Sequence, residues 1–99
     1  MESMTPSQPR IILQNSDEYR ESYANSVQLR ASLWDFFLLF GRVDPSSGEN
    51  VNIRNFQGIY LSPQQAKALL GVLQQHVGQY EASLGEIHLE ARSGSGFIQ

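Results

Sequence analysis

Apolar and polar side chains alternate along residues 23–31. The apolar positions share one parity and hold Tyr23, Val27, Leu29 and Ala31. Successive side chains of a β-strand point to opposite faces, so this alternation predicts a strand with one buried face. The alternation is lost in "DFFLLFGRV", residues 35–43, where both parities are apolar. One parity holds Phe36, Leu38 and Phe40, and the other holds Phe37, Leu39 and Val43. This segment predicts a second strand that is apolar on both faces.

Turns and a third strand surround these two segments. "SLWD", residues 32–35, leaves room only for a tight reversal, so the first two strands form a hairpin. "DPSSGEN", residues 44–50, is rich in turn-forming residues and predicts a surface loop. The apolar positions of a third strand follow at Val51, Ile53, Ile59 and Leu61. Gly58 lies inside this strand pattern and predicts a bulge or bend at "NFQG".

A long helix is predicted to begin at Pro63. Ser62 is a favourable N-cap, proline suits the first helical position, and Gln65 occupies the reach-back position of a capping box. The apolar stripe of this helix consists of Ala66, Leu69, Leu70, Leu73, Val77, Tyr80 and Leu84. These positions fall within about 100° of the helical wheel, the width of one core-facing face. Gly85 predicts the C-cap, which gives a helix of roughly 22 residues, about 33 Å long.

The predicted fold is α+β, an antiparallel meander of three to four strands with one long C-terminal helix packed across one face. The second apolar face of the sheet has no cover, because no other segment is long and apolar enough. Left in water, that face would expose a large apolar patch. A second copy of the chain is the simplest cover, so we predict a homodimer. Phe37, Leu39 and Val43 are the candidate dimer face, and the pattern leaves open which of the two sheet faces forms the seam.

The pattern divides the chain into three regions. Residues 1–20 are predicted to form a flexible N-terminal arm, in which "RIILQ", residues 10–14, is a candidate peripheral strand. Residues 21–87 form the single α+β domain, and residues 88–99 form a flexible tail. The tail carries Phe97 and Ile98 after "SGSG", which suits either a docking peptide or a frayed end.

Composition narrows the functional classes. The 99 residues are 40% hydrophobic and 17% charged, with a net charge of −3 and a single lysine, Lys67. Phosphate contacts need clustered Lys or Arg, so the scattered arginines argue against nucleic-acid binding. Cysteine is absent, which suits a reducing cytoplasm. No run approaches the roughly 18 apolar residues of a membrane span, so we predict a cytoplasmic protein without a membrane segment.

Several separated motifs are similar to one known family. "YANSV", "DFFLLFG" and "LSPQQAKALLGVLQQHVGQYEASLGEI" resemble a family of small bacterial proteins called domain-of-unknown-function family 3467. The matching positions are Asn25 and Val27, Asp35 to Gly41, Ser62 to Leu69, and Tyr80, Glu81 and Gly85. The resemblance covers residues 23–87 and implies a shared fold and lineage. It brings no catalytic motif.

Candidate chemistry is sparse. His76 and His88 could join Glu86 or Glu90 as metal ligands, but their spacing matches no standard motif. Asp35 lies between two aromatic residues, where a raised pKa would suit a general acid. A role in closing the tight turn is the simpler interpretation of that residue. We therefore predict no enzyme, no metal site and no cofactor.

Two surfaces remain as candidates for binding a partner. A band of mostly small residues lies opposite the helix stripe and is the candidate partner surface: Gly71, Gln75, Gly78 and Ala82, with Ala68 at its start. Arg54, Phe56 and Tyr60 share a strand parity and could stack unpaired bases. Glu81, beside the stripe, is predicted to tie the helix end to Arg30 or Arg42. The preferred function is a small non-enzymatic homodimeric module that binds an unknown protein. The alternative is single-stranded nucleic-acid binding through Arg54, Phe56 and Tyr60.

Overall fold

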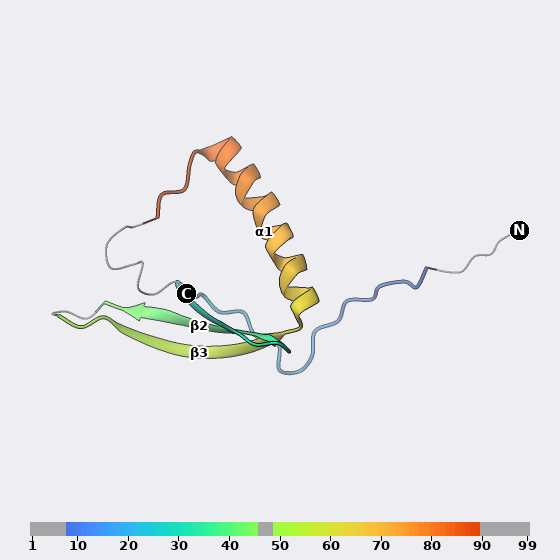
Figure 1. Cartoon of the computed structure of the whole chain (residues 1–99), viewed down its shortest axis with the longest axis horizontal. Coiled ribbons are helices and arrows are strands. Elements are labelled where there is room, and N and C mark those ends of the chain that lie inside the picture. The colour runs from blue at the N-terminus through green and yellow to red at the C-terminus, as the bar shows by residue number, and fades with distance from the viewer. Residues whose placement is uncertain (1–7, 46–48, 90–99) are drawn as a thin grey trace, which may run out of the picture.

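The chain forms a three-stranded antiparallel sheet followed by one long helix (Figure 1). The computed structural model describes residues 8–45 and 49–89. Its elements are β1 (Ser26–Ala31), β2 (Phe36–Asp44), β3 (Asn52–Leu61) and α1 (Pro63–Leu84). The predicted α+β fold, an antiparallel meander followed by one long C-terminal helix, is confirmed. The predicted packing of this helix across one face of the sheet is not seen, because none of its residues is buried. The predictions for the tail residues Phe97 and Ile98 and for Glu90 lie outside the described residues, as does part of the 44–50 loop.

The sheet has the order β1-β2-β3, so β2 is paired on both sides. The reversal between β1 and β2 is held by Ser32, whose backbone N–H donates to the carbonyl oxygen of Asp35 at 2.9 Å. The Ser32 hydroxyl oxygen accepts from the N–H groups of Trp34 and Asp35 at 3.0 and 3.2 Å. The same hydroxyl donates to Asp35 Oδ1 at 3.2 Å. Asp35 thus takes part in the turn, as predicted.

A bulge interrupts the pairing of β2 with β3. Phe40 lies opposite Gln57 and Gly41 lies opposite Asn55, so Phe56 is the extra residue. The prediction of an irregularity at "NFQG" is confirmed. The bulge inverts the side-chain parity of β3 after Phe56, from Gln57 onward, because the extra residue breaks the two-residue alternation.

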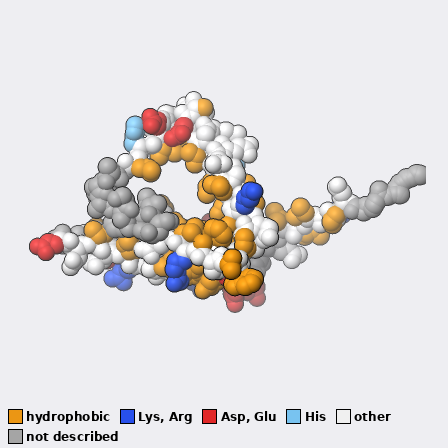
Figure 2. Space-filling model, in the orientation of Figure 1, with side chains coloured by type: hydrophobic (Ala, Val, Ile, Leu, Met, Phe, Trp, Pro, Cys, Tyr) orange, Lys and Arg blue, Asp and Glu red, His pale blue; other side chains and the backbone are white. Residues whose placement is uncertain are grey.

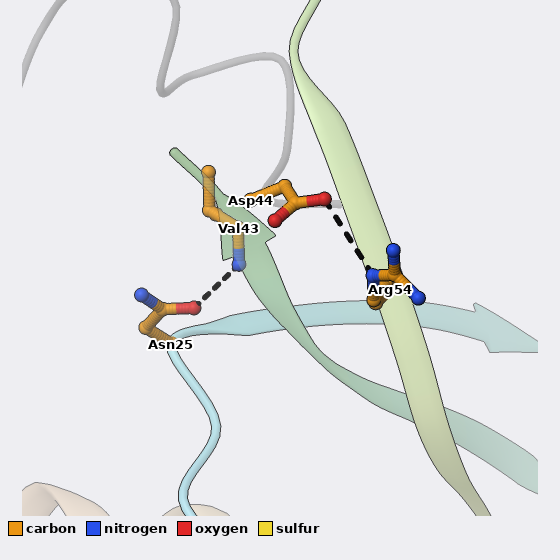
Figure 3. Close-up of polar contacts among 4 residues, drawn as sticks. All are labelled: Asn25, Val43, Asp44 and Arg54. Atoms are coloured by element: carbon orange, nitrogen blue, oxygen red, sulfur yellow. Dashed lines mark hydrogen bonds and ion pairs between the residues drawn. The ribbon is translucent and has the colours of Figure 1, made fainter. Parts of the chain in front are cut away.

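The chain before β1 is tied to the end of β2. The Asn25 N–H donates to the Gly41 carbonyl at 3.1 Å, and its side-chain Oδ1 accepts from the Val43 N–H at 2.8 Å (Figure 3). Arg42 Nε donates to the carbonyl oxygen of Tyr23 at 2.9 Å. Further upstream, residues 10–14 form no strand within the single chain and leave the body of the molecule (Figure 1).

Both ends of α1 follow the predicted capping. The Ser62 hydroxyl accepts from the Gln65 N–H at 3.0 Å, and Pro63 opens the helix. Gly85 adopts a φ of 112°, which L-residues rarely reach, and its N–H donates to the Glu81 carbonyl at 3.0 Å. The Glu81 carboxylate accepts from the Ile87 N–H at 2.9 Å. The predicted link from Glu81 to Arg30 or Arg42 is wrong, because the carboxylate is used to close the helix end.

The single chain has no hydrophobic core among the described residues. No apolar side chain there is buried, and Ser26 and Gly41 are the buried positions. None of the residues of α1 is buried. The helix contacts the sheet mainly through β3, from which it continues, and then rises away from it (Figure 1). Figure 2 shows hydrophobic side chains on the helix and on the sheet, with an opening between them.

Candidate functional site

One face of the sheet carries an aromatic row across all three strands. Phe37 lies opposite Arg30 on β1 and Tyr60 on β3. The Tyr60 ring centroid is 4.5 Å from that of Phe37 at an interplanar angle of 38°, and the Arg30 guanidinium carbon is 4.9 Å from the Phe37 centroid. These separations suit aromatic and cation–π attraction. We call this surface, with Leu39 and Val43, the Phe37 face.

Gly58 leaves room for the Phe37 ring beside β3. A Cβ atom at Gly58 would come within 2.7 Å of that ring, so the row depends on the missing side chain. Tyr60 stays 64% exposed, and Phe37, Leu39 and Val43 are only half-buried. The three residues predicted for the dimer seam therefore share one face and are accessible in the single chain.

The opposite face of the sheet is partly crossed by the chain that leads into β1. Residues 18–24 contribute alternate side chains to a hollow of about 350 Å³. Its walls are Phe40, Phe56, Gln57 and Ile59 from the sheet and Glu18, Arg20, Ser22 and Ala24 from the leading segment. The Arg42 guanidinium carbon lies 5.2 Å from the Phe56 ring centroid. We call this surface the Phe40 face. Val27 and Leu29 belong to it, because they lie opposite Phe40 and Leu38.

The structure separates the three residues proposed for nucleic-acid stacking. Phe56 lies on the Phe40 face, whereas Tyr60 stacks on Phe37 on the other side. Arg54 is opposite Arg42 and forms an ion pair with Asp44, Nε to Oδ2 at 3.5 Å (Figure 3). The expectation that all three share one face is wrong, because the bulge inverts the parity between Phe56 and Tyr60, so that only Arg54 and Phe56 remain on the Phe40 face.

The helix presents two contrasting surfaces. Its apolar stripe stays open to solvent, with exposed fractions of 55% for Leu70, 51% for Leu73, 41% for Val77, 51% for Tyr80 and 71% for Leu84. On the other side, a Cβ atom added at Gly71 or Gly78 would meet nothing within 4 Å. Gln75 and Ala82 are likewise exposed. The stripe lacks a cover, and the small-residue band leaves the helix backbone accessible.

The chemistry at the described residues is limited to simple polar contacts. In residues 8–45 and 49–89, no group of three His, Asp or Glu side chains is placed to hold a metal ion. A hydrogen bond from the Tyr19 hydroxyl to the Glu21 carboxylate raises the pKa of the phenol. No helix in this part of the chain has the length and apolar character needed to cross a bilayer.

Sequence reasoning missed two features of the site. The Arg30–Phe37–Tyr60 row depends on the register of the three strands. That register cannot be derived from the sequence until the position of the bulge in β3 is known. Asn25 was noticed only as part of a motif, although its position just before a strand suits a side chain that bonds neighbouring backbone.

Comparison with known proteins places the chain in one family and gives no further relative. The family described as "Protein of unknown function (DUF3467)" matches residues 1–89. This match extends the resemblance seen in the motifs to the N-terminal arm. No curated protein and no solved structure matches the chain.

Proposed function

We propose that this chain, which belongs to the DUF3467 family of proteins of unknown function, is a non-enzymatic homodimeric module that binds another protein. The observation that carries the proposal is the lack of any buried apolar side chain among the described residues. Burial of apolar surface is the main favourable term in folding, and it must offset the chain entropy. A second copy supplies the burial that one chain lacks, as in obligate homodimers without a stable folded monomer.

Surface area supports the same proposal. The chain exposes 8701 Å², whereas a compact monomer of 11.1 kDa exposes about 5,700 Å². The excess over the compact monomer is about 3,000 Å². Part of this excess comes from the extended arm. An interface between two copies removes surface from both of them, and the interfaces of obligate homodimers bury about 2,000–5,000 Å² in total.

The opening between α1 and the sheet is the place for the second copy. The helix stripe borders it with Leu70, Leu73 and Val77, all between 41% and 55% exposed. The Phe37 face is a second accessible apolar surface of the single chain, with half-buried aromatic and aliphatic side chains. Two such surfaces related by a two-fold axis are self-complementary, because each copy offers what the other lacks.

The band opposite the stripe is the proposed surface for a different protein. Gly71 and Gly78 leave room beside the helix backbone, and each costs about 1 kcal/mol of helix stability relative to Ala. A cost of this kind is consistent with a partner that approaches the backbone closely. The partner surface comprises Gly71, Gln75, Gly78 and Ala82. A cytoplasmic location stays a prediction, to be checked by cell fractionation.

Light scattering with sedimentation equilibrium tests the dimer. We expect a mass of about twice 11.1 kDa and a melting temperature that rises with protein concentration, because folding and association are coupled. Leu73→Glu should abolish the folded dimer. Gln75→Glu adds the same charge to the opposite side of α1 and should leave the dimer intact. A folded monomer whose melting temperature is independent of concentration would refute the proposal.

A further inference from the structure

The N-terminal arm carries three consecutive aliphatic side chains that touch almost nothing in their own chain. Ile11, Ile12 and Leu13 are 86%, 74% and 90% exposed. Residues 10–14 have no strand assignment and make no backbone hydrogen bond to the sheet in the described part of the chain. An apolar run with free backbone groups needs both a hydrophobic cover and hydrogen-bond partners.

The arm is directed away from its own sheet. A turn begins at Ser16, whose carbonyl accepts from the Tyr19 N–H at 3.1 Å and whose hydroxyl accepts from the Glu18 N–H at 3.2 Å. Downstream, Arg42 and Asn25 fix the entry into β1. Between these two points the chain crosses the Phe40 face toward β3. Residues 8–15 then extend from the body (Figure 1), in a molecule whose longest extent is 70 Å against 35 and 29 Å.

The sheet offers an unpaired edge of matching length. β1 is paired only with β2 within the described residues, so the outer backbone groups of Ser26–Ala31 are open. The edge of β3 is different, because α1 continues from that strand and makes its main sheet contact there. Open strand edges are the sites at which an extended segment of another chain adds to a sheet.

The side-chain pattern of the arm also matches the apolar side chains of β1. Val27 and Leu29 on the Phe40 face are 40% and 36% exposed. Ile11 and Leu13 share one parity in an extended segment, so they can continue that apolar surface beside Val27 and Leu29. The family match begins at residue 1, so the arm lies within the region that the family shares.

We infer that residues 10–14 of one copy pair with the open edge of β1 in a second copy, so that the two chains exchange arms. This inference rests on the proposed homodimer and names the contact that each arm makes in it. Exchange places the aliphatic run beside Val27 and Leu29 and gives both the arm and β1 their missing backbone partners.

Isotope-filtered NMR on mixed dimers tests the exchange. Labelled and unlabelled chains are unfolded together and refolded, and only contacts between copies are recorded. We expect contacts from the methyl groups of Ile11 and Leu13 to those of Val27 and Leu29, and amide exchange in residues 10–14 at least 100-fold slower than in an unstructured peptide. A dimer with exposed arms, or with arm contacts only inside one chain, would overturn the exchange alone. A monomer would overturn the proposed homodimer as well.

A pair of proline variants adds a functional measure. Ile12→Pro removes a backbone donor from the middle of the arm, and proline is not tolerated inside a strand pair. Gln8→Pro places the same residue outside the exchanged segment. We expect the dimer dissociation constant to rise at least tenfold for Ile12→Pro and to stay unchanged for Gln8→Pro. Equal dissociation constants for Ile12→Pro and the unmodified chain would count against the exchange.

Discussion

β2 and α1 differ in how their structure is held. β2 is hydrogen-bonded on both sides, and its side chains from Phe36 to Phe40 are all half-buried. The helix satisfies its backbone by itself and through its caps, yet buries none of its side chains. The difference shows that local sequence can specify an element completely while its burial depends on a surface elsewhere. In the proposed dimer, the second copy provides that surface.

Leu73→Ala should produce the largest loss of stability. The size of this loss shows whether the apolar stripe of α1 is covered in the folded protein. A Leu that is 51% exposed in a monomer would lose little on truncation. In a dimer core the same change removes buried methyl groups and leaves a cavity, at a cost of about 2–5 kcal/mol in the free energy of unfolding. Val72→Ala is the matched control, because Val72 is also 51% exposed but lies outside the stripe. Urea titration that gave equal, small losses for both would place the stripe in solvent.

Gly58→Ala should have the next largest effect and tests the packing of the Phe37 face. The added Cβ would meet the Phe37 ring at 2.7 Å, so the ring must leave its position beside Tyr60 and Arg30. Overpacking of this kind costs about 1–3 kcal/mol. Gln57→Ala, one residue away, should cost much less. Thermal unfolding of the two variants measures the difference, and an equally mild effect of both would show that the ring moves freely.

The elements with local signals could be predicted from the sequence. Ser62, Pro63 and Gly85 identified both ends of α1, because capping depends on a few residues close in sequence. The turn at Ser32 and the β1–β2 hairpin were readable for the same reason. The failures depend on non-local geometry. Arg54, Phe56 and Tyr60 were expected on one face, and only the register with β2 reveals the bulge that separates Phe56 from Tyr60.

Ser62→Ala should have a smaller effect and tests how far the helix depends on its own cap. The variant loses the hydroxyl that accepts from the Gln65 N–H at 3.0 Å. Loss of an N-cap costs about 1 kcal/mol. Ser83→Ala, an exposed serine near the other end of α1, is the control and should not destabilise the protein, because Ala is the better helix former. If urea titration gave Ser62→Ala a loss as large as that of Leu73→Ala, the helix would depend on its cap as much as on its stripe.

The smallest change in stability is expected for Gly78→Ala. Whether this variant is more or less stable shows whether the outer side of α1 lies in solvent or in a packed interface. Nothing lies within 4 Å of the added Cβ, and Ala is favoured over Gly in a helix by about 0.8–1 kcal/mol. The variant should therefore be slightly more stable and still dimeric, as measured by urea titration and light scattering. Gly78→Leu should also keep the dimer, but it should abolish capture of the partner protein in affinity purification with mass spectrometry. Ser83→Leu, which lies off the band, should retain capture. Destabilisation or dissociation of the dimer by Gly78→Ala would mean that the band belongs to the dimer seam, and the proposed partner surface would have to be given up.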